Sequence, residues 1–278
     1  MDTSYFSEYA HLSPGNADKS KMFLGTDLSK SYADSRPVYT AELFKTVVDY
    51  CLETRPSLDL AVDMGCGSGA STIGFARYFN KVIGVDISET QIACAPKDIP
   101  NCEFKVGHSD KLPFIQSGTA DLFCFGTSFH WVPQAETLAE VDRVLRPGGI
   151  IAIFGYDVPS SSIQAVQACF QRLWKKVFPF AAKETAQVME RFRGLKMPYP
   201  GAIRNDDIKL KLDYTVQDTI NFLKSTRSTQ AYLETHPHED LLGEITQELT
   251  QALETSGAGD VYTITFNIYL LMAHKPAN

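Results

Sequence analysis

The sequence predicts an α/β protein whose parallel sheet is covered by helices on both faces. Short apolar runs alternate with helical patterns over residues 58–154, and a glycine-rich turn joins the first run to the next helix. After residue 155 the alternation stops and helical patterns dominate. Alternating strands and helices form βαβ units, which bury both faces of a parallel sheet. We therefore expect a doubly covered sheet followed by a helical cap.

The expected elements follow in chain order. Apolar residues at helical spacing predict an amphipathic helix over residues 38–53. Strands are predicted at Leu58–Val62, Val82–Val85, Phe104–Val106, Leu122–Phe125 and Ile150–Phe154. Helices are predicted between them at Ser71–Phe79, Glu89–Ala95 and Glu136–Leu145.

The second half of the chain has fewer strand signals. Residues 161–193, 216–234 and 239–255 have helical patterns, whereas Ile208–Tyr214 alternates strictly and Val261–Ala273 is rich in β-branched and aromatic residues. We expect four parts: an N-terminal lid segment (1–36), a cofactor-binding core (37–155), a helical cap (156–257) that includes one core strand at about 206–214, and a final core strand (258–278).

Composition excludes several classes of function. The 278 residues carry a net charge of −7, which argues against nucleic-acid binding because phosphate contacts require a basic surface. No apolar run reaches 18 residues and the N-terminal residues lack a basic-then-apolar signal, so we expect no membrane association. The six cysteines form no C-x-x-C pair, which predicts reduced thiols, no metal site and a cytoplasmic location.

The turn Val62–Ala70 (Val-Asp-Met-Gly-Cys-Gly-Ser-Gly-Ala) carries the strongest functional signal. Its three glycines allow the backbone to turn sharply and to approach a ligand closely, and the following helix points its first N–H groups at the same crevice. About twenty residues later the second strand ends at Asp86, whose carboxylate can accept hydrogen bonds from ribose hydroxyls. The pair predicts a nucleoside-containing cofactor.

The glycine pattern alone leaves a nicotinamide dinucleotide possible, because Gly65-x-Gly67-x-x-Ala70 satisfies that degenerate fingerprint. Asp63 and the additional Gly69 favour another cofactor. Further motifs follow at Leu112-Pro113-Phe114, Asp121-Leu122-Phe123 and Leu145-Arg146-Pro147-Gly148-Gly149.

With these motifs, residues 30–155 resemble the class I S-adenosylmethionine-dependent methyltransferases. The resemblance implies a Rossmann-like sheet of seven strands, mostly parallel with an antiparallel last strand, and S-adenosylmethionine as the cofactor. It implies that Asp86 binds the ribose and that the loop with Ser109 and Asp110 flanks the adenine. The other expected cofactor contacts are Asp63, Gly65, Gly67, Ile87 and Thr127.

A narrower resemblance links the chain to the trans-aconitate methyltransferase-like branch of the type 11 methyltransferases. It rests on Tyr32-Ala33-Asp34-Ser35-Arg36-Pro37-Val38-Tyr39, on Phe129-His130-Trp131 and on Leu223–Ser228. In that branch the equivalents of Tyr32 and Arg36 lie over the methionine end of the cofactor. The cap departs from the branch at Arg227, where an aromatic residue is common.

Residues after the fourth and fifth strands are candidates for the chemistry. His130 could bind the acceptor, act as a general base near pH 7, or merely cap the strand end. Trp131 could form an apolar wall or bridge the sheet and the cap. We expect His130, Trp131 and Tyr32 to be catalytic, and the acceptor to meet His130, Trp131, Tyr156, Arg227 and Ser228.

The leading hypothesis is a methyltransferase, monomeric or homodimeric, that acts on a small molecule, with oxygen of a carboxylic acid as the expected acceptor atom. A small-molecule N-methyltransferase is the alternative. A nicotinamide-dependent oxidoreductase and a non-catalytic cofactor-binding protein also fit the fold, since fold alone does not fix function.

Overall fold

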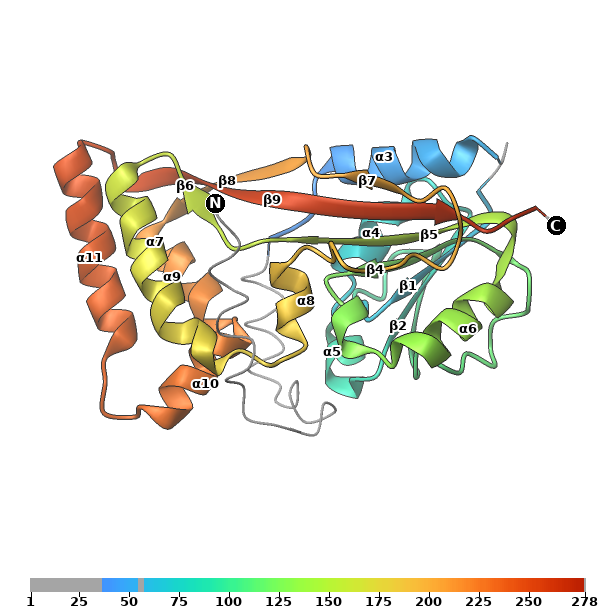
Figure 1. Cartoon of the computed structure of the whole chain (residues 1–278), viewed down its shortest axis with the longest axis horizontal. Helices are drawn as coiled ribbons and strands as arrows, with labels where there is room; N and C mark the ends of the chain where they lie inside the picture. The colour runs from blue at the N-terminus through green and yellow to red at the C-terminus, as the bar shows by residue number, and fades with distance from the viewer. Residues whose placement is uncertain (1–36, 55–57, 278) are drawn as a thin grey trace.

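The computed structural model describes residues 37–54 and 58–277 (Figure 1). The expected lid segment 1–36 lies outside the described residues. The proposed boundaries between lid, core, cap and final strand stay predictions.

The centre of the molecule is a sheet of parallel strands, as predicted. Strands β1 (Leu60–Met64), β2 (Lys81–Asp86), β3 (Cys102–Val106), β4 (Ala120–Gly126) and β5 (Leu145–Tyr156) lie in the order β3-β2-β1-β4-β5. All four neighbouring pairs among them are parallel, so their carboxyl ends meet at one edge of the sheet. This is the edge at which open α/β sheets bind ligands.

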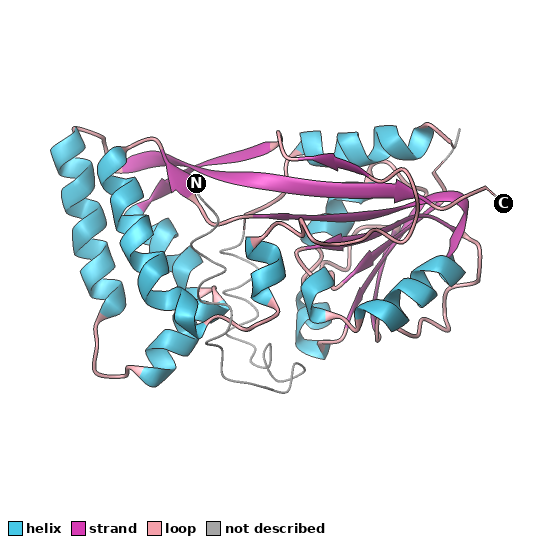
Figure 2. Cartoon of the chain, in the orientation of Figure 1, coloured by secondary structure: helices cyan, strands magenta, loops and turns pink. Residues whose placement is uncertain are grey.

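Helices cover both faces of the sheet (Figure 2). The helices of the first half are α3 (Ala41–Leu52), α4 (Ala70–Ala76), α5 (Glu89–Cys94) and α6 (Gln134–Val144). Successive side chains of a strand alternate between two separate apolar cores: in β4, Leu122 and Cys124 join one core, and Phe123 and Phe125 join the other. The predicted class, an α/β sheet with helices on both faces, is confirmed.

The longest strand, β9 (Val261–His274), joins the sheet to the helices of the second half. Its residues 268–274 pair antiparallel with β5, and its residues 261–267 pair antiparallel with β8 (Lys209–Thr215). In Figure 1 the strand begins near α7 (Gln164–Val177), α9 (Val216–Lys224) and α11 (Leu241–Ser256), and its arrow runs along the molecule to the parallel sheet. One backbone segment therefore belongs to both halves of the structure.

The described sheet has nine strands where seven were expected. Strands β6 (Ser160–Ser161) and β7 (Ile203–Asn205) each pair with β9, and they are too short to show an alternating pattern in the sequence. They exist because β9 extends well beyond β5 and offers backbone groups on both of its sides.

The helical patterns of the second half break into shorter elements. Residues 161–193 contain α7, the 3-10 turn η3 (Phe178–Phe180) and α8 (Thr185–Met189), and residues 216–234 split into α9 and α10 (Arg227–Thr235). The hydroxyls of Ser225 and Thr226 donate to the carbonyls of Phe222 and Leu223. Hydroxyls that bind nearby carbonyls in this way compete with the helix, which explains the break.

Phe266 on β9 links the two halves through aromatic contacts. Its ring is fully buried, and ring centroids lie 5.3 Å away at Tyr156 on β5 and 5.3 Å away at Phe222 on α9. Removing this ring would leave a cavity, because the neighbouring side chains cannot move in to fill it.

We predict that Phe266→Ala lowers the free energy of unfolding by about 3–5 kcal/mol, the usual cost of emptying a buried Phe site. Val261→Ala on the same strand is the matched control, because Val261 is 57% exposed and should change stability by less than about 0.5 kcal/mol. Denaturant unfolding measures both variants. Equal stability of the two would show that the β9 contact does not hold the halves together.

Candidate active site

The glycine turn folds back onto the end of β2. The N–H groups of Gly65 and Cys66 both donate to the carbonyl oxygen of Val85, at 2.7 and 3.1 Å. Gly65 has a φ of +69° and Gly67 a φ of +55°, values that favour glycine. A Cβ at Gly65 would lie 2.4 Å from the Cβ of Ser128, so this close approach of β1 to the β4 end also requires glycine.

Asp63 fixes the helix that follows the turn. Its carboxylate is fully buried and accepts hydrogen bonds from Ser71 Oγ at 2.7 Å and Thr72 Oγ1 at 2.6 Å, both in the first turn of α4. The thiol of Cys124 on β4 donates to its other oxygen at 3.7 Å. Burial raises the pKa of Asp63, and the hydrogen bonds from Thr72, Ser71 and Cys124 oppose this shift.

Asp86 holds the opposite side of the turn. One carboxylate oxygen accepts from the N–H of Gly67 at 2.8 Å, and the other accepts from the N–H of Ser88 at 2.9 Å. Burial raises the pKa of this carboxyl, whereas the backbone N–H groups lower it. A carboxylate oxygen can accept more than one hydrogen bond, so each oxygen keeps capacity for a ligand.

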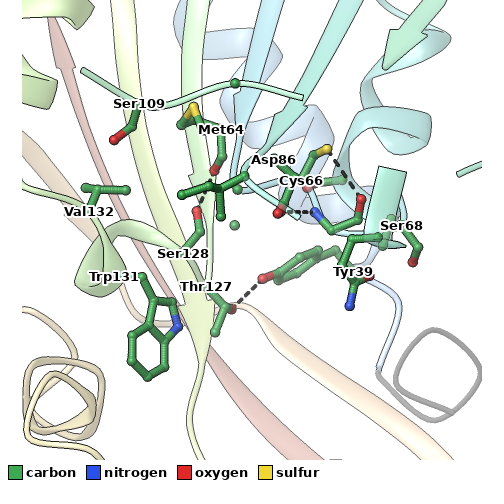
Figure 3. Close-up of a pocket in the computed structure, with 18 of the residues that line it drawn as sticks. Tyr39, Met64, Cys66, Ser68, Asp86, Ser109, Thr127, Ser128, Trp131 and Val132 are labelled. Atoms are coloured by element: carbon green, nitrogen blue, oxygen red, sulfur yellow. Dashed lines mark hydrogen bonds between the residues drawn. The ribbon is translucent and has the colours of Figure 1, made fainter. Parts of the chain in front are cut away.

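A pocket of about 430 Å³ opens at the carboxyl ends of the parallel strands. Figure 3 shows part of its lining, with Asp86 and Cys66 on one side and Trp131 and Val132 on another. The volume lies within the usual range of small-molecule and cofactor sites. The pocket draws on the connections after β1, β2, β3 and β4, on the last residue of β5, and on residues 37–39 before α3.

The end of the pocket at β4 and β5 has a tyrosine–threonine pair at its centre. The hydroxyls of Tyr39 and Thr127 lie 2.7 Å apart (Figure 3). Thr127 has a φ of +53°, and its N–H donates to the carbonyl of Phe154 on β5. Ser128 Oγ donates to the carbonyl of Met64 at 2.5 Å, which ties the β4 end to the glycine turn.

Most of the expected site residues lie on this pocket. The lining includes Gly65, Gly67, Asp86, Ile87, Ser109, Asp110, Thr127, Trp131 and Tyr156. Their roles toward cofactor and acceptor stay predictions. Tyr32 and Arg36 lie outside the described residues.

The structure does not bring Asp63, His130, Arg227 or Ser228 to the pocket lining. Asp63 faces α4 from within the core and holds the turn through Ser71 and Thr72, and its expected cofactor contact stays a prediction. His130 is buried in the 3-10 turn η2 (Phe129–Trp131), and its ring centroid lies 4.6 Å from that of Trp131.

The expected acceptor contacts in the cap are absent from the described lining for a local reason. The guanidinium of Arg227 pairs with Glu234 on its own helix at 2.9 Å, which turns it along the surface of α10. Ser228 is buried in the first turn of the same helix.

Sequence reasoning missed Tyr39, Gln91 and Ser128, all of which line the pocket. Tyr39 stood at the end of the Tyr32–Tyr39 motif, so its position carried a signal. Gln91 lies in the first turn of the helix after Asp86, and Ser128 precedes the Phe-His-Trp motif, but neither residue type indicates a ligand contact without the fold.

Comparison with known proteins identifies the fold and the activity. Residues 62–153 match the family described as a methyltransferase domain. A Dictyostelium discoideum protein that carries the name methyltransferase is 28% identical over 252 residues, which is 89% of this chain and 93% of that protein. Together with the fold, these similarities support an S-adenosylmethionine-dependent methyltransferase.

One further relative and one solved structure are similar to this chain. A trans-aconitate 2-methyltransferase of Acidovorax ebreus is 27% identical over 76% of this chain and 85% of its own length. A solved structure described as a type II methyltransferase from Anaeromyxobacter dehalogenans superposes with a TM-score of 0.72 at 23% identity, over 87% of this chain and 99% of that one. The latter likeness concerns the fold.

The residues present fit S-adenosylmethionine, the cofactor of this family. The turn offers a backbone surface without side chains at Gly65 and Gly67, and the Asp86 carboxylate stands beside it. Among the described residues there is no group of three or more metal-ligating side chains, and no helix there is long and apolar enough to cross a membrane.

We predict that the stability of the folded protein depends on pH through the Asp63 carboxyl. Because burial raises its pKa in the folded state above the unfolded value of about 3.9, its folded form binds a proton that the unfolded chain releases. Its contribution to stability is therefore complete below pH 3.9 and falls as the pH rises. Asp63→Asn does not titrate, so the melting temperature of wild type should fall relative to this variant between pH 4 and 8.

Thermal unfolding at several pH values measures this difference. Asp98→Asn, at an exposed position, is the matched control and should follow wild type throughout. A gap between Asp63→Asn and wild type that is constant with pH, or that changes in the opposite direction, would refute the assignment.

Proposed function

We propose that this methyltransferase transfers the methyl group of S-adenosylmethionine to a carboxylate oxygen of a small-molecule acceptor. One observation supports this most. At the β4–β5 end of the pocket, the titratable groups among the described lining residues are the hydroxyls of Tyr39 and Tyr156, whereas the lining imidazole, His108, belongs to the connection after β3. A neutral phenol is a poor base near pH 7, so this end favours a nucleophile that is already ionised.

A carboxylate meets that requirement because its usual pKa lies near 4. An amine that is protonated at neutral pH would first need a base. His130 was one candidate for this base, but its ring packs against that of Trp131 and it is not among the described lining residues. The thiol of Cys66 does line the pocket, but burial raises its pKa well above the ordinary value, so it stays protonated.

The names of the relatives agree with this proposal. Trans-aconitate 2-methyltransferases of two Acidovorax strains align with 76% and 62% of this chain. We extend from them only the class of reaction, methylation of an acid.

In the proposed mechanism the cofactor, when bound, supplies a methyl carbon activated by the sulfonium charge. Asp86 accepts a hydrogen bond from the ribose, and Ile87, Ser109 and Asp110 hold the adenine side. Ser109 is itself fixed by a hydrogen bond to Thr137 at 2.8 Å. Fixed groups of this kind lower the barrier by orienting the reactants.

The acceptor would lie against Trp131, Val132 and Pro133, with Tyr156 on another wall. These side chains exclude water from the reacting groups. The Tyr39–Thr127 hydroxyl pair stands beside them and can donate a hydrogen bond to the acceptor's carboxylate. His130 then acts as a positioning residue, because its ring packs on that of Trp131.

The proposal is tested with trideuteromethyl S-adenosylmethionine and matched sets of acids and amines that share the same carbon skeletons. We expect label in methyl esters, which alkali hydrolyses, and none in the amines. The rate should be nearly constant from pH 6 to 8, because no group of the reaction titrates there.

Label in alkali-stable N-methyl products, with a rate that rises through pH 6 to 8, would support the N-methyltransferase instead. Trp131→Ala serves as the site control: it should lower the kcat/KM for the acid while the Kd of S-adenosylhomocysteine stays within about threefold, since its proposed contact is with the acceptor.

A further inference from the structure

Gln91 lines the pocket, and its side-chain amide includes an oxygen without a hydrogen-bond donor among the described residues. It lies in the first turn of α5, where its N–H donates to the Ser88 hydroxyl at 3.3 Å. The residue is 4% exposed and lines the pocket. Within the described part of the chain, its Oε1 atom is buried and has no hydrogen-bond partner.

A buried carbonyl oxygen without a partner is expensive, because it has lost water and gained nothing in return. Such an atom in a binding pocket has a simple explanation when a ligand supplies the missing donor. The amide therefore indicates an O–H or N–H group of the ligand at this point of the pocket.

The position of Oε1 shows which ligand group this is. A Cβ built on Gly67 would lie 3.6 Å from Gln91 Oε1, so the amide oxygen stands over the same glycine whose N–H donates to Asp86. Asp86 and Gln91 thus place two acceptors around one glycine. Asp86 ends β2 and Gln91 lies in the helix α5 that follows it.

Two neighbouring acceptors match two neighbouring donors. The ribose of the cofactor carries a pair of adjacent hydroxyls, whereas its adenine amine and its ammonium group lie at opposite ends. Each Asp86 oxygen already accepts a hydrogen bond from one backbone N–H. With Gln91 Oε1 as a second acceptor, the carboxylate needs to bind only one of the two hydroxyls.

From these contacts we infer that Gln91 Oε1 accepts a hydrogen bond from one of the two ribose hydroxyls, and that Gln91 and Asp86 together select an intact ribose diol. Gln91 is then a specificity-determining residue of the cofactor site. The inference concerns the cofactor and holds whichever acceptor is methylated.

The test measures binding of adenosine, 2′-deoxyadenosine and 3′-deoxyadenosine by displacement of S-adenosylhomocysteine. It needs no acceptor, so its outcome is separate from that of the acid assay. Gln91→Met keeps an unbranched side chain of similar length and removes the acceptor oxygen. Gln251→Met, at an exposed position of α11, is the matched control.

We expect Gln91→Met to bind adenosine roughly three- to tenfold more weakly, the effect of one neutral hydrogen bond. It should also lose the preference for adenosine over one of the two deoxynucleosides, while Gln251→Met behaves as wild type. The ligand-free Gln91→Met protein should melt no lower than wild type, because the substitution removes a buried acceptor that has no partner.

A Gln91→Met protein that keeps the full preference for both hydroxyls, or that loses affinity for all three nucleosides equally, would overturn the inference. Gln91→Glu gives a second route if Gln91→Met does not fold. It retains a side-chain oxygen acceptor and should keep the wild-type order of the three nucleosides, and a changed order would also overturn the inference.

Discussion

The hydrogen bonds of the buried Asp63 carboxylate determine the geometry of the site. This one side chain joins β1, the first turn of α4 and β4 through Ser71, Thr72 and Cys124. The glycine turn lies between these elements, so its backbone is fixed on both sides before any ligand binds. A site that is fixed before binding loses less entropy when the ligand arrives.

The second constraint is the continuous strand β9. Because its two halves pair with β5 and β8, the helices of the second half are held relative to the parallel sheet. A row of aromatic rings extends this connection to the pocket. The ring centroids of Tyr39 and Tyr156 lie 5.8 Å apart, and those of Tyr156 and Phe266 lie 5.3 Å apart. Packing in the cap therefore supports the wall that the proposed acceptor meets.

The sequence was informative where a local rule applied. Apolar runs and the spacing of Gly65, Gly67 and Asp86 predicted the parallel sheet and one side of the pocket, because turns and strand ends follow from short-range chemistry. The sequence could not show whether His130 and Arg227 line the pocket. The position of His130 depends on a 3-10 turn, and that of Arg227 depends on its ion pair with Glu234. Gln91 was missed because a glutamine on a helix can face solvent, the core or a ligand, and the sequence does not distinguish these environments.

A crystal structure with S-adenosylhomocysteine and a methylatable acid tests the central claim most directly, namely that the pocket binds the cofactor's ribose at Asp86 and receives the acceptor's carboxylate at its β4–β5 end. The account predicts the ribose at Asp86, the sulfur facing Thr127 and Trp131, and the acid's carboxylate beside the Tyr39 hydroxyl. A cofactor bound with its adenine against Trp131, or an acid held away from the sulfur, would contradict it.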